Sequence, residues 1–102
     1  MIFVLDFDGT YAATPNVWNQ FISNAASEGH TVVCATMRHE DLEGDEVKDA
    51  FANRAVRKII FTDRKAKYKI VQDALLADGY NPIDIHRAVW IDDNPQWLFQ
   101  DA

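Results

Sequence analysis

Four short apolar segments, each about the length of a strand, alternate along the chain with segments that mix apolar and polar positions. The apolar segments cover residues 2–7, 31–36, 58–62 and 88–92. They are apolar at consecutive positions, which is typical of strands buried on both faces. Because helical patterns occur between them, we predict an α/β fold, a Rossmann-like three-layer sandwich around a minimal parallel sheet of about four strands.

The segment after the first strand carries the clearest helix signals. Thr14 and Pro15 are typical of a helix start, and Gly29 is typical of a helix end. The apolar side chains between them recur at helical spacing. We therefore expect one buried face made of Val17, Trp18, Phe21, Ile22, Ala25 and Ala26.

Three further helices are expected. Residues 37–45 are polar and predict a loop, after which a short helix from about Asp45 turns inward Val47, Ala50 and Phe51. A longer helix runs from about Lys65 to Asp78 and buries Ile70, Val71, Ala74 and Leu75. A cap and a proline at 94–95 start a short last helix, whose aromatic residues we expect in the core or in a dimer patch: Trp97 and Phe99.

The composition, 48% hydrophobic and 25% charged, fits a single domain spanning residues 1–102. The net charge of −6 argues against broad binding to nucleic acid or anionic membranes, although it allows local contacts with a nucleic-acid end. Cys34 is the only cysteine and lies in an apolar run, so we expect a buried free thiol and a cytoplasmic protein. No segment is long enough to span a membrane, and the apolar start is too short for a signal peptide.

Polar side chains gather where the predicted strands end, at the edge where open parallel sheets bind ligands. Asp6 and Asp8 follow the first strand, and Thr36 ends the second. Asp92 and Asp93 follow the fourth strand. Lysines at 65, 67 and 69 open the helix after the third strand, so the sequence directs acids, a hydroxyl and an ammonium group to one edge.

Carboxylates that converge on one site cannot all stay ionised without a cation. Oxygen ligands without histidine favour Mg²⁺ over Zn²⁺. A divalent cation, a lysine and a hydroxyl suit the oxygens of a phosphate group, whose transfer depends mostly on positioning and charge stabilisation. In the acidic pair after the first strand, one carboxylate can attack phosphorus while the other moves the proton.

These residues resemble the haloacid dehalogenase (HAD) superfamily. The similarity rests on four features in order: D-x-D-G-T at residues 6–10, Thr36, a lysine that opens a later helix, and the Asp92–Asp93 pair. It covers nearly the whole chain. The resemblance implies an HAD-like fold and a Mg²⁺-dependent phosphatase.

The resemblance also implies a role for each motif residue. Asp6 would be the nucleophile and a metal ligand, and Asp8 the general acid/base with its backbone carbonyl on the metal. Thr36 would donate a hydrogen bond to the phosphoryl group. Asp92 would bind Mg²⁺ directly, and Asp93 would support it directly or through water. Two further motif residues are expected to contact the substrate, namely Gly9 and Thr10.

The sequence offers three candidates for the lysine, which alternate in RKAKYK. Lys67 shares the apolar face of its predicted helix and would point toward the sheet, whereas Lys65 and Lys69 lie on another face. We therefore favour Lys67, with Lys69 as the second choice.

Superfamily members usually carry a cap domain, inserted after the first motif or before the lysine. Few residues separate Thr10 from the first helix, and almost none separate Thr62 from Lys65. We therefore expect a capless, open site, and a sheet without the fifth strand of larger relatives.

Two residues near the site allow more than one interpretation. Arg38 follows Thr36 in a T-x-R that resembles polynucleotide kinase 3′-phosphatase domains, in which the arginine holds substrate phosphate. Alternatively, Arg38 pairs within its loop with Glu40 or Asp41. Tyr11 either stacks on a base of the substrate or packs its turn onto the sheet.

The sequence thus predicts a Mg²⁺-dependent phosphomonoesterase that forms an aspartyl phosphate on Asp6 and acts on a phosphorylated substrate, such as a nucleotide or a nucleic-acid end. One alternative is a phosphoacceptor like a response-regulator receiver domain. A receiver places its lysine after its last strand, whereas the lysines here precede Asp92. The other alternative is a non-catalytic regulatory protein that keeps the fold, and the oligomeric state stays open.

Overall fold

The computed structural model describes all residues from Met1 to Ala102. One sheet contains four parallel strands in the order β3-β2-β1-β4. They are β1 (Ile2–Asp6), β2 (Thr31–Thr36), β3 (Ile59–Phe61) and β4 (Val89–Ile91). The predicted α/β sandwich with a parallel sheet of about four strands is confirmed.

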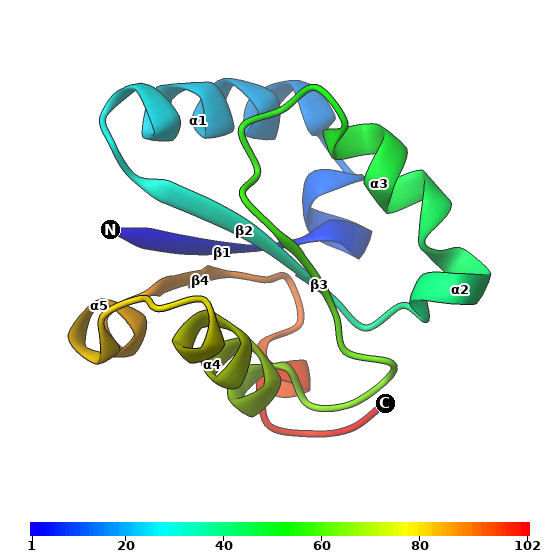
Figure 1. The fold of residues 1–102 in the computed structure, drawn as a ribbon. Helices are drawn as coiled ribbons and strands as arrows, with labels where there is room; N and C mark the ends of the chain where they lie inside the picture. Colours follow the sequence, from blue (N-terminus) through cyan, green and yellow to red (C-terminus); the bar gives the residue numbers. More distant parts are fainter.

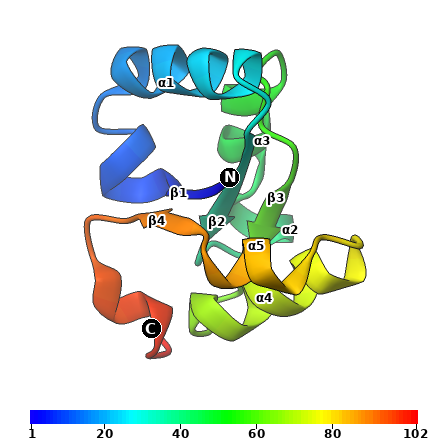
Figure 2. The same cartoon turned by 90° about the vertical axis from the view of Figure 1, so that its left-hand side faces the viewer.

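Helices cover both faces of this sheet (Figures 1 and 2). α1 (Pro15–Ser27) and α3 (Asp45–Phe51) lie on one face. α4 (Lys67–Ala77) and α5 (Pro82–His86) lie on the other face. None of the helices combines the length and the apolar character needed to cross a bilayer.

Two cores, one on each face, explain why the strands are apolar at consecutive positions. Successive side chains of a strand point to opposite faces. Leu5 and Cys34 therefore belong to the core under α1 and α3, whereas their neighbours Val4 and Val33 belong to the core over α4 and α5. Cys34 is a buried free thiol, as predicted, and its burial raises the pKa of the thiol.

The first helix follows the sequence prediction in its bounds but not in the width of its buried face. Ile22 and Ala25 are buried against the sheet. Val17 is 57% exposed and Ala26 is also exposed, so the expected face was too wide. A helix that lies on a sheet buries only a stripe of its surface, and these two residues flank that stripe.

α4 begins at Lys67, two residues later than predicted, because the loop before it makes a tight turn. Asp63 and Arg64 both have left-handed backbone conformations, with φ of 59° and 65°. The Thr62 hydroxyl donates a hydrogen bond to the carbonyl oxygen of Lys65 at 2.8 Å and closes the turn. The predicted inward face of the helix is largely confirmed.

Two short helices were not predicted from the sequence. α2 (Glu40–Glu43) lies in the segment predicted as a loop, and α5 follows α4 directly. α5 has a clear local signal, because the Asn81 side chain accepts a hydrogen bond from the Ile83 backbone N–H at 2.8 Å and Pro82 follows as the first helical residue.

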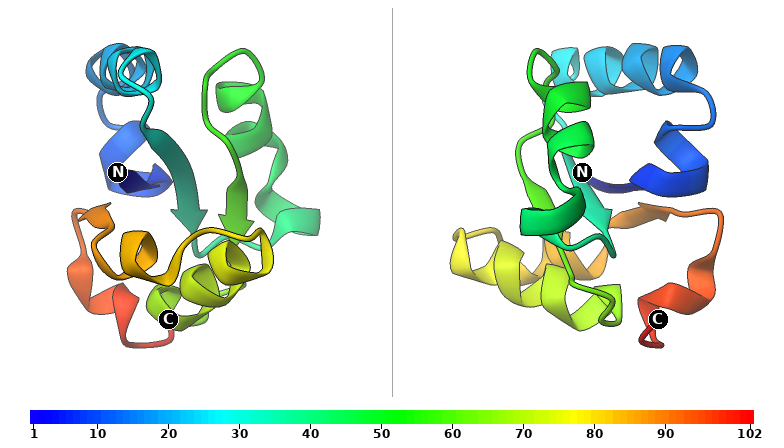
Figure 3. Two further views of the ribbon diagram at one scale, coloured as in Figure 1. Left: turned by 60° about the vertical axis from the view of Figure 1, so that its left-hand side comes forward. Right: turned by 90° about the vertical axis from the view of Figure 1, so that its right-hand side faces the viewer.

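The last short helix, η2 (Pro95–Leu98), starts at its proline as predicted. Leu98 is buried, but the prediction of a core position for Phe99 is wrong, since Phe99 is 72% exposed. The short helix leaves its ring outside the sheet layers, at 5.3 Å between ring centroids from Tyr68. The chain then passes beside the start of α4 (Figure 3), where Asp101 Oδ1 accepts a hydrogen bond from the backbone N–H of Ala66 at 2.8 Å.

Candidate active site

A cleft of about 250 Å³ opens at the carboxyl ends of β1 and β4. Ligands bind at this edge in open parallel sheets. Four acidic motif residues and the favoured lysine contribute to its lining, which consists of Asp6, Asp8, Met37, Arg64, Lys67, Asp92, Asp93, Asn94, Trp97 and Ala102.

Lys67 lies between the acids that end β1 and β4. Its Nζ donates hydrogen bonds to Asp6 Oδ1 at 2.7 Å and to Asp92 Oδ2 at 2.6 Å. The Lys67 side chain is only 3% exposed, whereas that of Lys69 is 83% exposed and pairs with Asp73. Helical phase thus identified the lysine that reaches the sheet.

Thr10 joins the third acid to this group. Its Oγ1 lies 3.1 Å from both Asp6 Oδ2 and Asp93 Oδ1, so the hydroxyl proton serves one of them at a time. The backbone N–H of Asp93 donates to the same Oγ1 at 3.2 Å. Asp6, Asp92, Asp93 and Lys67 are called the Lys67 cluster below.

The turn after β1 allows this close approach. In η1 (Phe7–Tyr11), Gly9 has a φ of 77°, which favours glycine. A Cβ atom at Gly9 would lie 2.3 Å from Asp93 Oδ2. Glycine is therefore required here for two reasons, the backbone conformation and the space that Asp93 occupies.

Charge in the Lys67 cluster is unbalanced, because it contains three carboxylates and one ammonium group. Of these acids, Asp6 and Asp92 contact Lys67 directly. Burial raises the pKa of Asp6 to about 7, although the hydrogen bond from Lys67 acts in the opposite direction. Burial alone would lower the pKa of Lys67, but the hydrogen bonds to Asp6 and Asp92 outweigh it, and the pKa is raised. When all four groups are ionised, two negative charges stay uncompensated.

The same cluster fits a divalent cation. Carboxylate oxygens of Asp6, Asp92 and Asp93 lie within 4.8 Å of one another, close enough to share one ion. An all-oxygen ligand set suits Mg²⁺, and its charge would match the excess negative charge. The Asp8 carboxylate is not part of this group.

Asp8 turns toward Arg38 instead. Its two oxygens accept hydrogen bonds from Arg38 Nη2 at 2.8 Å and Nε at 3.0 Å. Arg38 Nη1 also pairs with Glu46 Oε1 at 2.8 Å, and the guanidinium lies 5.0 Å from the centre of the Phe7 ring. Arg38 thus pairs with acids, as one interpretation expected, but with Asp8 and Glu46. These three charged residues are called the Arg38 cluster.

The remaining predicted site residues lie close to the cleft without opening into it. Thr36 is buried, its Oγ1 accepts a hydrogen bond from the Arg38 backbone N–H at 3.3 Å, and it does not line the cleft. Tyr11 is only 4% exposed and donates a hydrogen bond to Asn19 Oδ1 at 2.7 Å. The packing interpretation of Tyr11 is therefore correct, since a buried ring cannot stack on a base.

Five residues that line the cleft were not predicted as site residues from the sequence: Met37, Arg64, Asn94, Trp97 and Ala102. Trp97 was expected in the core or in a dimer patch, but it is half-buried and lines the cleft. Met37 directly follows the predicted strand end at Thr36, which was a usable signal. No local pattern marked Arg64, because its position depends on the left-handed turn that precedes α4.

Comparisons of this chain with models of protein families, with curated proteins and with solved structures give no match. Its function is therefore inferred from the motif residues and from the geometry of the cleft.

Proposed function

We propose that this protein is a Mg²⁺-dependent phosphomonoesterase of the HAD type. One observation carries the proposal: the Lys67 ammonium group lies between Asp6 and Asp92, within hydrogen-bond distance of both. Thr10 adds Asp93 to the same group. If the acids after β1 served only to form a turn, they would need none of these long-range contacts. Phosphoryl transfer, in contrast, needs an anchored carboxylate beside a cation site.

Asp6 is the nucleophile in this proposal. A carboxylate oxygen of Asp6 forms a bond to phosphorus while the bond from phosphorus to the leaving oxygen breaks, which gives an aspartyl phosphate. Lys67 donates a hydrogen bond to one oxygen of Asp6, and Thr10 is within hydrogen-bond distance of the other, so both contacts can orient the carboxylate. Asp6, Asp92 and Asp93 would hold a Mg²⁺ ion, which would supply positive charge for the phosphate oxygens.

Asp8 moves the protons. It donates a proton to the leaving oxygen and then accepts one from the water that attacks the aspartyl phosphate. Breaking the bond between phosphorus and Asp6 releases inorganic phosphate and restores the carboxylate. Asp8 must exchange its hydrogen bonds with Arg38 for these contacts, and because its side chain is 58% exposed, the exchange costs little.

The cleft is formed by loops and helix ends that belong to the sandwich itself. We infer a capless HAD phosphatase whose open site accepts phosphate on nucleotides or on nucleic-acid ends in the cytoplasm. Arg38 in its T-x-R is a candidate for substrate phosphate, after release from Asp8. Gly9 and Thr10 shape the turn against which the phosphate would lie.

Phosphate release from para-nitrophenyl phosphate in the presence of Mg²⁺ tests this function. We expect turnover that stops with EDTA, returns with added Mg²⁺ and is abolished in Asp6→Asn. Asp73→Asn is the matched control, because Asp73 is an exposed acid on α4 that pairs only with Lys69. The proposal is wrong if the Mg²⁺-loaded protein releases no phosphate from nucleotides, phosphorylated oligonucleotides, phosphopeptides and sugar phosphates.

A slow phosphoacceptor is the second candidate, and the Arg38 cluster is the observation that favours it. With Asp8 held by Arg38, a phosphorylated Asp6 would lack the base that activates water. The lifetime of the protein-bound phosphate after a single addition of acetyl phosphate distinguishes the two. An adduct that lasts for minutes supports the phosphoacceptor, and rapid release of phosphate supports the phosphatase.

A further inference from the structure

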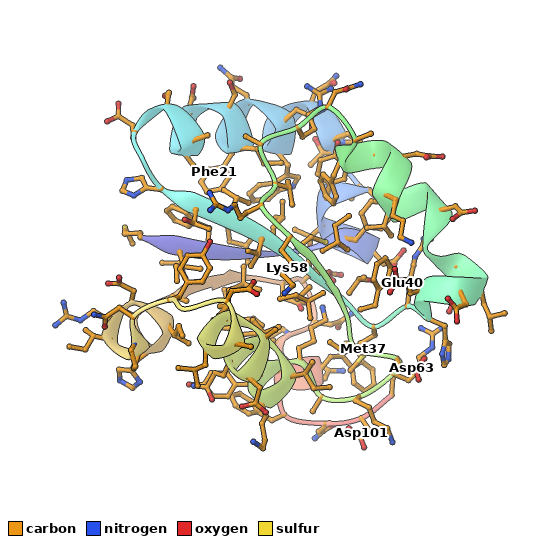
Figure 4. The ribbon with its side chains drawn as sticks, viewed as in Figure 1. Phe21, Met37, Glu40, Lys58, Asp63 and Asp101 are labelled. Atoms are coloured by element: carbon orange, nitrogen blue, oxygen red, sulfur yellow. The ribbon has the colours of Figure 1, made fainter.

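Part of the cleft lining has no task in the proposed transfer of the phosphoryl group. Met37 follows β2, Arg64 follows β3 and Trp97 belongs to η2, so three separate segments meet here. Figure 4 labels Met37, Asp63 and Asp101 at this end of the molecule, one near each of these segments. These lining residues provide a guanidinium group, an indole ring and a thioether, all outside the Lys67 cluster.

The backbone of Arg64 is held in an unusual conformation. Both Asp63 and Arg64 have positive φ although neither is glycine, and such residues concentrate at functional sites. The Arg64 backbone N–H donates to the Met37 carbonyl oxygen at 2.8 Å, and its carbonyl oxygen accepts from the Ala102 N–H at 2.8 Å. Contacts on both sides therefore fix the point from which the Arg64 side chain extends.

The guanidinium of Arg64 keeps free hydrogen-bond donors. Its Nη2 lies 2.9 Å and 3.1 Å from the two carboxylate oxygens of Glu43, which orients the group. Neither Nε nor Nη1 donates to a protein group, and the side chain is 46% exposed. The only other cationic side chain in the lining is Lys67, which is already bound by two carboxylates.

A guanidinium with free N–H groups recognises a phosphate group through paired hydrogen bonds. The indole of Trp97 presents a flat apolar surface, on which a planar base can stack. Both lie in one cleft of about 250 Å³ with the Lys67 cluster. A ligand that uses all three must therefore carry its reacting phosphate, its ring and a second negative group close together.

We propose that the substrate is a nucleoside with phosphate groups on two different sugar hydroxyls, and that Arg64 binds the phosphate that is not transferred. Trp97 stacks on the base. This inference rests on the proposed function for the reacting phosphate and adds the class of substrate. A terminal phosphate on an oligonucleotide offers the same chemistry, because the neighbouring phosphodiester supplies the second charge.

The small nucleotide is favoured over a long polyanion or a peptide. The net charge of −6 repels an extended nucleic acid, and Arg64 can pair with only one phosphate. α2 and α3 carry several acids outside the cleft lining, which an extended acidic phosphopeptide would meet and a small nucleotide held within the cleft would not. A nucleoside bisphosphate concentrates its ring and both charges on one sugar.

Calorimetry on the Mg²⁺-loaded Asp6→Asn variant, which cannot form the covalent adduct, tests the ligand class. The probes are adenosine 3′,5′-bisphosphate, adenosine 5′-monophosphate, ribose 5-phosphate and a phosphotyrosyl peptide. We expect the bisphosphate to bind about tenfold more tightly than the monophosphate, as for one charge-assisted contact. The monophosphate should bind about tenfold more tightly than the sugar phosphate, as for one stacked base.

Variants assign these two preferences to side chains. Arg64→Gln should remove the preference for the second phosphate and leave the binding of the monophosphate unchanged, and Arg64→Lys should retain part of it. Arg64→Gly should also remove the preference for the second phosphate, although glycine adopts the positive φ at this position without strain. Lys65→Gln, at the neighbouring exposed lysine, should change nothing. Trp97→Leu should remove only the preference for the base.

The outcomes separate this inference from the proposed function. Turnover of para-nitrophenyl phosphate without a preference for the bisphosphate would overturn the inference and leave the phosphatase standing. Equal loss of binding for all ligands in Arg64→Gln would assign Arg64 a structural role and would overturn the inference. Tightest binding of the phosphotyrosyl peptide would also overturn the inference. Preference for the phosphorylated end of an oligonucleotide over the bisphosphate would retain Arg64 and Trp97 but overturn the small-nucleotide assignment. Arg64-dependent binding without any turnover would support the ligand class and contradict the phosphatase.

Discussion

Two clusters at the same edge of the sheet use the same chemistry in different surroundings. In each of them one cationic side chain bridges two carboxylates: Lys67 bridges Asp6 and Asp92, and Arg38 bridges Asp8 and Glu46. The side chains of Lys67, Asp6 and Asp92 are at most 8% exposed, whereas Asp93 is exposed. The two acids that pair with Arg38 are 58% and 66% exposed.

This difference in burial determines how strongly the charges interact in each cluster. Water screens the charges of the Arg38 cluster, so its pairs contribute little and can exchange partners cheaply. Asp6, Asp92 and Lys67 are shielded from water, so the excess negative charge of these three groups persists and favours a cation. The comparison predicts that changes of equal chemistry will have large effects in the Lys67 cluster and small effects in the Arg38 cluster.

The largest effect is expected from Lys67→Met. The substitution leaves two buried carboxylates without their shared partner, which costs about 3 kcal/mol or more of the free energy of unfolding. Urea denaturation in EDTA measures this loss, and added Mg²⁺ should recover part of it by binding the two carboxylates that have lost their partner. Lys69→Met is the control on the same helix, since its 83% exposed side chain should change stability by less than about 0.5 kcal/mol. Equal losses in the two variants would show that burial does not distinguish the clusters.

The pH dependence of stability comes next. Because the pKa of Asp6 in the folded protein is raised from 3.8 to about 7, the folded state binds its proton more tightly than the unfolded state does. The contribution of Asp6 to stability is therefore present at low pH and is lost as the pH rises from about 4 to about 7. Urea midpoints of the metal-free protein across this range should show that loss, and Asp6→Asn should reduce it. A loss of the same slope in Asp6→Asn would assign the dependence to other groups.

The same pH range can be used to detect the binding of Mg²⁺. Mg²⁺ binds the ionised carboxylates, so stabilisation by added Mg²⁺ should grow as the pH rises through this range. Stabilisation by Mg²⁺ that is independent of pH would place the ion elsewhere.

Gly9→Ala should have an intermediate effect. The positive φ costs about 1 kcal/mol for a residue with a Cβ atom, and that atom would also displace the Asp93 carboxylate. Gly29→Ala is a matched control, because Gly29 has a φ of 81° and no atom lies within 4 Å of the position that a Cβ atom would take there. Both variants should lose similar backbone stability, but only Gly9→Ala should weaken the binding of Mg²⁺, measured by calorimetry. Normal Mg²⁺ affinity in Gly9→Ala would exclude Asp93 from the cation site.

Arg38→Gln should have the smallest effect on stability. Its two acidic partners are exposed, so the loss of unfolding free energy should stay below about 1 kcal/mol at low salt. Because salt screens exposed charges, the difference from the wild type should shrink further in concentrated NaCl. Urea denaturation at two salt concentrations measures the loss of unfolding free energy and its dependence on salt. A loss as large as that of Lys67→Met would show that the Arg38 cluster is also a buried charge network.

The fold was largely accessible from the sequence because its elements carry local signals. Consecutive apolar positions marked the four strands, and cap-and-proline pairs marked α1 and η2. The overlooked α5 begins with the same pair, Asn81 and Pro82, so its signal was present. Helix faces were less accurate, as Val17 and Phe99 show, because the depth to which a residue is buried depends on its neighbours in space.

The candidate site was accessible in part. The motif residues after β1 and β4 were found, and helical phase selected Lys67 from three lysines. The partners of Arg38 were not found, because Asp8 lies 30 residues away in the sequence and meets Arg38 only where β1 and β2 end side by side. Arg64 and Trp97 were also missed as cleft residues, since one depends on a left-handed turn and the other on how η2 folds back.

The sequence by itself determined which segments become strands and helices, and which acids, hydroxyls and lysines stand at their ends. Only the tertiary structure decided how those groups pair, because the strand order and register bring together residues as distant as Asp6 and Lys67, 61 positions apart. It also decided that Lys67 is buried together with two of its acids, whereas the two acids that pair with Arg38 are exposed. Periodicity is a property of the local chain, whereas the strength of a charge pair depends on how much water the assembled fold excludes around it.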